Sequence, residues 1–124
     1  MCGLEVLVAL VVIALVKKLR VLFACAIGMS SSLLETRTKE AAKKRGIELE
    51  LEAIPITNFY KYDIDGLDCI LLGPQIRHKL KEVEKRASEF GIPVGVIDFQ
   101  TYGMVDGEKT LKLILELVGK KTQQ

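Results

Sequence analysis

Apolar runs separated by polar, turn-forming residues mark four strands along the chain. Residues 19–25 (LRVLFAC) and 68–73 (DCILLG) are almost continuously apolar, which is typical of strands buried on both faces of a sheet. Residues 47–53 (IELELEA) alternate strictly between apolar side chains and glutamates, which indicates a half-exposed strand at a sheet edge. Residues 93–98 (PVGVID) predict a fourth strand.

Helical patterns lie between these strands. Residues 30–45 predict a helix, for which Ser32 and Glu35 fit a capping box and Gly46 supplies a left-handed stop. Pro74 suits the first position of a second helix that stops at Gly91. Its apolar stripe has helical spacing and consists of Ile76, Leu80, Val83, Ala87 and Phe90.

Two further segments complete the pattern. Residues 108–118 predict a last helix, with leucine and valine residues on one stripe. Residues 55–65 are turn-rich and hold at most one short helix.

Strands that alternate with helices predict an α/β fold with a parallel sheet and right-handed crossovers. With the strand at 47–53 on an edge, we expect an open four-stranded sheet of order 2-1-3-4, with helices on both faces. This arrangement is flavodoxin-like, or low-molecular-weight phosphatase-like. We expect one domain over residues 17–120, a hydrophobic extension over 1–16 and a short tail over 121–124.

The extension contains a run of 13 residues (LEVLVALVVIALV) that is apolar except for Glu5. As a helix it would span about 20 Å, against a hydrocarbon core of about 30 Å, so it is a poor membrane span. It also lacks the basic start and cleavage site of a signal peptide. We expect a dispensable extension; a short membrane-associated or partner-binding helix, the end of a lost membrane domain and a start-site artefact are the alternatives.

Composition narrows the class of protein. A net charge of +2 does not call for a nucleic-acid partner, and basic residues are not interleaved with aromatic ones. Three cysteines without CxxC spacing argue against a disulfide framework or a structural zinc site and suit a reducing compartment. With a single histidine, His78, a histidine-based metal site is not expected. We therefore expect a protein of a reducing compartment without a metal site.

The segment FACAIGMSSS carries the candidate chemistry. Cys25 ends the first strand beside the point where the strand order reverses, which is where such sheets bind ligands. The loop behind it can turn its backbone N–H groups inward, and the next helix adds the positive end of its dipole. The same field favours a thiolate, the nucleophilic form of cysteine. The predicted phosphate cradle consists of Ala26, Ile27, Gly28, Met29, Ser30, Ser31 and Ser32.

The alternative interpretation is that Cys25 is a buried structural thiol, because cysteine also packs as a small apolar residue. The glycine and serines that follow it favour the nucleophile. Cys69 lies inside a predicted strand, and for that residue we expect the structural role.

Low-molecular-weight tyrosine phosphatases place a cysteine, five residues, an arginine and a serine or threonine at the same kind of strand end. Here Ser31 stands at the arginine position. Without a guanidinium to clamp the phosphoryl oxygens, a phosphocysteine should resist water, which suits a phosphoryl carrier.

Four segments carry a resemblance to a known family. They are VLFACAIGMSSSLL, EAIPI, ILLGPQIRHKL and VIDFQTYGMVDGEKTLK, each at the carboxyl end of a predicted strand. The chain resembles the IIB component of the lactose/cellobiose/chitobiose class of the bacterial phosphoenolpyruvate-dependent sugar phosphotransferase system. Two departures are the hydrophobic extension and the unbroken run of three serines, where a threonine is expected in the middle.

The resemblance implies a phosphoryl relay. A phosphohistidine on a IIA partner would donate to Cys25, and the phosphocysteine would pass the group to a β-linked disaccharide held by the membrane transporter IIC. We expect a cytoplasmic monomer that meets IIC at the inner face of the membrane. The resemblance implies no cofactor, because the relay uses phosphorylated protein donors.

Smaller expectations concern docking. Ile27 and Met29 would be docking contacts or would turn into the core beneath the loop. Gln75 and Arg77 would border the site or simply start and solvate a helix, and Tyr102 would cover the loop or contact a partner.

Two other classes of function stay open. A phosphatase or arsenate reductase of the same fold lacks support, because the arginine is missing and no resolving cysteine is evident. A regulatory or interaction module that kept the fold is the other alternative, and the intact Cys25 loop counts against it.

Overall fold

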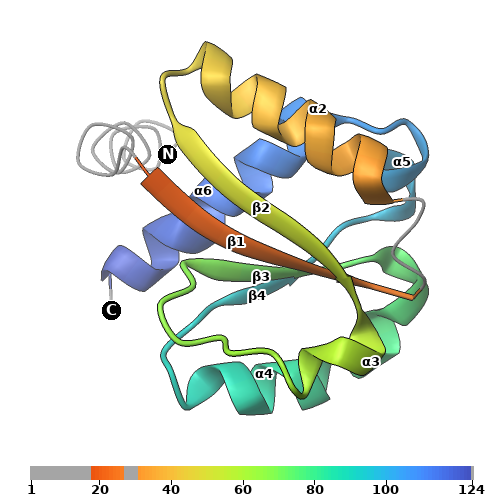
Figure 1. Ribbon diagram of the computed structural model, residues 1–124, viewed down its shortest axis with the longest axis vertical. Helices are drawn as coiled ribbons and strands as arrows, with labels where there is room; N and C mark the ends of the chain where they lie inside the picture. Colours follow the sequence, from red (N-terminus) through yellow and green to blue (C-terminus); the bar gives the residue numbers. More distant parts are fainter. Residues whose placement is uncertain (1–17, 27–30, 124) are drawn as a thin grey trace, which may run out of the picture.

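The computed structural model describes residues 18–26 and 31–123. Its centre is a four-stranded sheet of order β2-β1-β3-β4, and all three strand pairs are parallel (Figure 1). The strands are β1 (Lys18–Cys25), β2 (Glu48–Pro55), β3 (Cys69–Leu72) and β4 (Val94–Val96). The predicted fold class and strand order are confirmed. The predicted extension over residues 1–16 lies outside the described residues.

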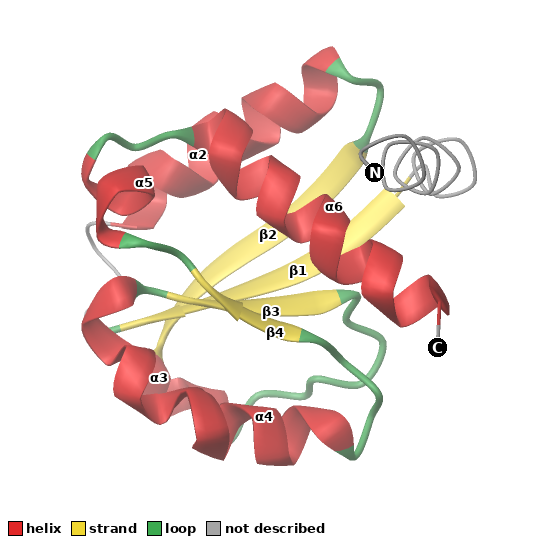
Figure 2. Ribbon diagram, turned by 180° about the vertical axis from the view of Figure 1, so that it is seen from behind, coloured by secondary structure: helices red, strands yellow, loops and turns green. Residues whose placement is uncertain are grey.

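Helices cover both faces of the sheet (Figure 2). The long helices α2 (Ser31–Lys44) and α6 (Gly107–Gln123) share one face. The other face carries α3 (Ile56–Phe59) and α4 (Leu80–Ser88). None of the helices that the structure describes combines the length and apolar character needed to cross a bilayer.

The alternation of side chains along β1 divides the core into two layers. Val21, Phe23 and Cys25 point into the layer beneath α2 and α6, whereas Leu22 and Ala24 point into the layer beneath α3 and α4. All five residues are at most 2% exposed, as expected for a central strand of a parallel sheet. Cys25 therefore belongs to the layer that contains the α2 helix following it.

The edge strand β2 has the predicted two-sided character. Glu48, Glu50 and Glu52 are exposed, whereas Leu51 is buried and Leu49 is half-buried. The two predicted glycine stops are also confirmed, because Gly46 and Gly91 follow helices with φ of 74° and 67°.

Three details of the helix prediction were wrong. First, α2 already begins at Ser31, so Ser32 lies inside the helix and is not its N-cap. Glu35, the other half of the predicted capping box, accepts a hydrogen bond from Lys39 Nζ at 3.0 Å, an i,i+4 pair on the helix surface.

Second, the helix predicted from Pro74 to Gly91 is two elements. A 3-10 segment, η1 (Pro74–Lys79), precedes α4, and Ile76 inside it has non-helical φ and ψ of −118° and 24°. Pro74 does occupy the start of this element. Phe90, predicted on the buried stripe, is 45% exposed because it lies in the turn after α4 has ended.

Third, the segment after β4 is more helical than predicted. A short helix, α5 (Phe99–Gly103), follows the strand, and α6 extends beyond the predicted end at residue 118 into the segment predicted as a tail. Asp98 caps α5, since its Oδ1 accepts a hydrogen bond from the Thr101 backbone N–H at 2.6 Å.

Candidate functional site

Cys25 is the last residue of β1, at the carboxyl edge of the sheet where the strand order reverses. It is 2% exposed, and its neighbour in the β2 register is Pro55. The thiol donates a hydrogen bond to the Ile54 carbonyl oxygen, with Sγ and O 3.5 Å apart. A nucleophile at this place meets the general rule for ligand sites in open α/β sheets.

The predicted phosphate cradle lies only partly within the described residues. Ala26 is an exposed bend residue directly after Cys25, while Ile27, Gly28, Met29 and Ser30 lie outside the described residues. Ser31 and Ser32 form the first turn of α2. The first turn of a helix has backbone N–H groups without intrahelical acceptors and carries the positive end of the helix dipole. The structure thus brings a helix N-terminus to the chain segment that follows the thiol.

The end of β3 lies on the other side of Cys25. The Gly73 backbone N–H donates to the Ala24 carbonyl oxygen at 2.9 Å, which continues the pairing of β1 and β3 past the last strand residue. A Cβ placed on Gly73 would lie 3.7 Å from Cys25 Cβ and 3.6 Å from Phe23 Cε1. Gly73 is therefore the direct neighbour of the candidate nucleophile.

The two polar residues predicted near this edge are exposed and differ in their surroundings. Gln75 turns its amide toward Gly73, with Oε1 3.1 Å from the position of the absent Cβ. Arg77 stacks on Phe99, its Cζ lying 5.3 Å from the ring centroid. This contact joins the segments after β3 and β4 and holds a cation at the carboxyl edge of the sheet.

Tyr102 is half-buried and anchored in the core. Its ring meets the Phe23 ring edge to face, with centroids 6.4 Å apart and planes at 84°. Phe23 lies two residues before Cys25, so the two side chains lie on the same face of β1. Tyr102 therefore supports the layer directly beneath the candidate nucleophile.

Sequence reasoning missed three exposed apolar residues in the segments that follow strands β1 and β4. Leu33 in the first turn of α2 is 50% exposed, Phe99 is 55% exposed and Met104 is 68% exposed. Both ribbon views place α5 beside the beginning of α2 (Figures 1 and 2). The sequence did contain a signal for these residues: each is an apolar residue that follows a strand end and does not belong to the apolar stripe of a predicted helix.

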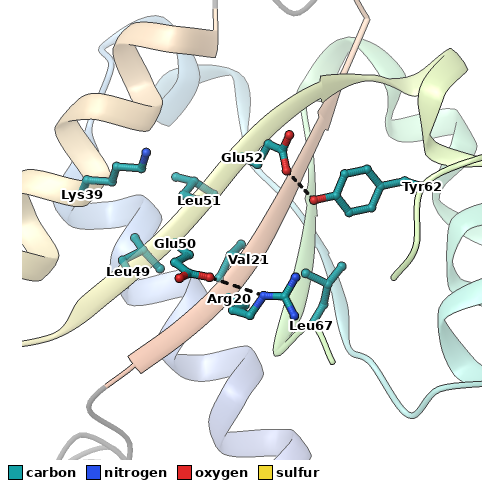
Figure 3. A pocket seen from close by; sticks show the side chains of 9 residues that line it. All are labelled: Arg20, Val21, Lys39, Leu49, Glu50, Leu51, Glu52, Tyr62 and Leu67. Carbon is teal, nitrogen blue, oxygen red and sulfur yellow. Dashed lines mark hydrogen bonds and ion pairs between the residues drawn. The ribbon is translucent and has the colours of Figure 1, made fainter. Parts of the chain in front are cut away.

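A separate hollow of about 270 Å³ follows the β2 edge of the sheet (Figure 3). Its polar groups bind one another: Arg20 Nε lies 3.4 Å from Glu50 Oε2, and the Tyr62 hydroxyl donates to Glu52. That hydrogen bond raises the pKa of Tyr62. Exposed carboxylates repel a phosphoryl group, and Cys25 is not among the residues that line this hollow. It does not serve the proposed chemistry.

The remaining candidates have structural positions. Cys69 is wholly buried, as expected for a structural thiol, and His78 is exposed on η1. Within residues 18–26 and 31–123, no three of the histidine, cysteine, aspartate and glutamate side chains are grouped to hold a metal ion.

Comparison with known proteins agrees with this geometry. Residues 20–113 match the family model described as "PTS system, Lactose/Cellobiose specific IIB subunit". The chain is 40% identical over 99 residues to the oligo-beta-mannoside-specific EIIB component of Bacillus subtilis, covering 80% of this chain and 95% of that protein.

Two solved structures have the same fold. The lactose-specific IIB domain of Streptococcus pneumoniae superposes with a TM-score of 0.72 at 25% identity, covering 82% of this chain and 98% of that one. The cellobiose-specific IIB component of Borrelia burgdorferi gives a TM-score of 0.68 at 35% identity, covering 84% and 94%.

Proposed function

Since the chain belongs to the lactose/cellobiose-specific IIB family of the sugar phosphotransferase system, we propose that Cys25 is the residue that carries the phosphoryl group. Members of this family are phosphotransferase components that take part in sugar uptake. The observation that carries the proposal is the position of Cys25, at the carboxyl end of β1 and a short loop before the N-terminus of α2. In the part of the chain that the structure describes, the other cysteine is Cys69. It is the first residue of β3 and therefore lies at the amino end of the parallel strands, opposite to Cys25.

Phosphorylation of Cys25 is a displacement at phosphorus. The thiol first loses its proton to solvent, and the thiolate sulfur attacks the phosphorus of a phosphohistidine on a IIA protein. An S–P bond forms while the N–P bond breaks, and the imidazole nitrogen keeps the electron pair and takes up a proton. The N-terminus of α2 lowers the energy of the negative charge on sulfur and on the phosphoryl oxygens.

The second transfer delivers the group to sugar. A hydroxyl of a sugar bound to the membrane component IIC attacks the phosphorus, an O–P bond forms and the S–P bond breaks. Cys25 leaves as the thiolate, and the hydroxyl proton passes to solvent. No arginine stands six positions after Cys25, where phosphatases hold the phosphoryl oxygens, so the phosphocysteine lasts until this acceptor arrives.

Backbone N–H groups of residues 26–32 would bind the phosphoryl oxygens, with the serine hydroxyls as further donors. Partner proteins would dock on the exposed residues around the carboxyl edge. Arg77 supplies a cation for an anionic phosphorylated donor, and Phe99 with its neighbours supplies apolar area. Ile27, Met29 and Gln75 belong to the same proposed surface.

The sugar follows from the class of relatives. The relatives compared above are named for oligo-beta-mannoside, lactose and cellobiose, so we propose a β-linked disaccharide or a short β-linked oligosaccharide. The chain would act as a cytoplasmic monomer that meets IIC at the inner face of the membrane. Residues 1–16 would be dispensable for this activity.

The test is phosphorylation of sugar by the reconstituted relay. Phosphoenolpyruvate, the two general carrier proteins, a IIA protein and membranes that contain the matching IIC are combined with wild-type protein, Cys25→Ser or a chain that begins at residue 17. We expect sugar phosphate with the wild type and the shortened chain and none with Cys25→Ser. Equal sugar phosphorylation with Cys25→Ser and wild type would refute the assignment of Cys25, and no sugar phosphate with either protein would favour a regulatory module.

A further inference from the structure

Cys25 lies between two different neighbours in the sheet. On the β2 side, the Ile54 carbonyl oxygen accepts the hydrogen bond from the thiol. On the β3 side, Gly73 follows the last strand residue and is bonded through its N–H to Ala24. The two sides therefore differ in kind: one offers a hydrogen-bond acceptor and the other offers a residue with no side chain.

The contact with Ile54 is possible only for the thiol. A phosphorylated sulfur has no proton to donate, and its phosphoryl oxygens are negatively charged acceptors. The carbonyl oxygen of Ile54 repels such a group. If Cys25 is the phosphorylated residue, as the proposed function requires, the phosphoryl group must lie away from β2.

Gly73 leaves room on the β3 side. Its φ and ψ of −67° and 152° are ordinary extended values that any residue adopts, so backbone conformation does not require a glycine here. A Cβ at this position would instead stand 3.7 Å from Cys25 Cβ. A side chain at residue 73 would therefore contact the side chain of Cys25.

Gln75 faces the same space. Its Oε1 lies 3.1 Å from the point where the Gly73 Cβ would be, so the amide and the Cys25 Cβ flank one position. A half-turn of the amide exchanges oxygen and nitrogen at little cost, and the nitrogen supplies two donors. Because this amide is exposed and uncharged, a docking IIA or IIC protein does not have to break an ion pair to reach the phosphoryl group.

We propose that Gly73 and Gln75 form the phosphoryl-binding wall on the β3 side of Cys25. Gly73 leaves the volume that a phosphoryl oxygen enters, and the Gln75 side-chain NH2 donates a hydrogen bond to that oxygen. This inference rests on the proposed function and adds two site residues to it, both outside the loop of residues 26–32.

Gly73→Ala tests the space. The added methyl displaces the Gln75 amide and occupies the volume beside Cys25, whereas the extended backbone accepts alanine. We expect phosphorylation by phosphorylated IIA to slow about tenfold or more, with an unfolding midpoint equal to or above that of the wild type. Ser88→Ala is the control, because Ser88 is an exposed residue at the C-terminal end of α4, before β4 begins, and its phosphorylation rate should not change.

A Gly73→Ala protein that is phosphorylated within twofold of the wild-type and Ser88→Ala rates would overturn the role of Gly73. If this variant does not fold, the Gln75 variants decide the proposal alone.

Gln75 is tested at equilibrium with IIA. Gln75→Leu keeps the approximate size of the side chain but removes its hydrogen-bond donors. Gln75→Glu adds a negative charge, which repels the anionic phosphoryl group. The fraction of phosphoryl group on this chain, in an equimolar mixture with IIA, should fall about tenfold for leucine and further for glutamate. Lys85→Gln is the control. It changes the net charge by the same amount as Gln75→Glu, at an exposed position on α4, and should leave the phosphorylated fraction unchanged.

The direct observation is the side-chain amide resonance. Phosphorylation of wild-type protein should move the Gln75 NH2 resonances downfield by much more than those of Gln100 on α5. Unmoved Gln75 resonances, together with wild-type equilibria for Gln75→Leu, would overturn the proposal.

All of these measurements compare variants with a wild-type protein that accepts the phosphoryl group on Cys25. A wild type that IIA does not phosphorylate at Cys25 would refute the proposed function instead, so the two failures are distinguishable.

Discussion

Cys25 and Cys69 are both buried thiols on neighbouring strands, yet they occupy opposite edges of the sheet. Cys25 is 2% exposed at the end of β1, and Cys69 is 0% exposed at the start of β3. Cys69 lies opposite Val21 in the register, four positions before Cys25. Residue type and burial hardly separate the two residues.

What separates them is the chain that follows. After Cys25 the chain leaves the sheet at its carboxyl edge and begins α2 at Ser31, so a helix N-terminus is available to an anion. After Cys69 the chain continues through Ile70, Leu71 and Leu72, all wholly buried. A cysteine is therefore recognised as a candidate nucleophile by its position at the end of a strand, and not by the exposed fraction of its side chain.

The sharpest way to break this comparison is to remove each thiol in turn. Cys25→Ser should lower the rate of phosphoryl transfer from IIA by about a thousandfold or more, since the nucleophile is lost. Cys69→Ser should keep at least half of the wild-type rate per folded molecule. Labelled phosphoenolpyruvate and a quenched time course measure both rates, and equal losses in the two variants would contradict the comparison.

Alkylation probes the same difference without partner proteins. Cys25 borders an exposed bend at Ala26, whereas Cys69 lies in a central strand that opens only when the domain unfolds. In native protein we expect iodoacetamide to modify Cys25 at least about tenfold faster than Cys69. Phosphorylated protein should lose the fast phase, and equal rates for the two thiols would show that the edge gives Cys25 no advantage.

Stability should show the reverse order. Cys69→Ser places a hydroxyl in the α2 and α6 layer of the core and should lower the free energy of unfolding by about 1–3 kcal/mol. Cys25→Ser should cost less, because its hydroxyl can still donate to the Ile54 carbonyl oxygen. Urea unfolding of both variants measures the difference, and a larger loss for Cys25→Ser would count against the structural role of Cys69.

The smallest expected effect on stability is that of removing the Asp98 cap of α5, the helix that follows β4. The Thr101 backbone N–H lowers the pKa of Asp98 below its ordinary value of 3.8. A lowered pKa in the folded state stabilises the fold above pH 3.8, and this stabilisation is lost as the pH falls further. Asp98→Ala should therefore lower the unfolding midpoint at pH 7, by a margin that shrinks toward pH 3, as thermal unfolding would show. A margin that is independent of pH would contradict the cap.

The elements that sequence predicted well are those with strong periodicity. The glutamates of β2, the continuous apolar run of β1 and the glycine stops at Gly46 and Gly91 each leave a local pattern that tertiary packing does not override. The placement of Cys25 follows from the same patterns, because the strand order fixes which strand ends meet.

The remaining features depend on contacts that a linear pattern does not contain. The short helix α5 has no apolar period and depends on the Asp98 cap. The bend at Ile76 and the exposure of Phe90 follow from where η1 and α4 join and end. The neighbourhood of Gly73 and Cys25 brings together residues far apart in the chain, so only the sheet register reveals it.

The central claim is that Cys25 carries the phosphoryl group, and trypsin separates the two thiols onto different peptides. Cys25 lies in residues 21–37 and Cys69 in residues 62–77. Wild-type protein is incubated with phosphoenolpyruvate, the two general carrier proteins and IIA, and its peptides are then analysed by mass spectrometry. We predict one phosphoryl group on peptide 21–37, lost when sugar-loaded IIC membranes are added. A phosphoryl group on peptide 62–77, or none on a folded protein with a IIA that phosphorylates its own IIB, would contradict the account.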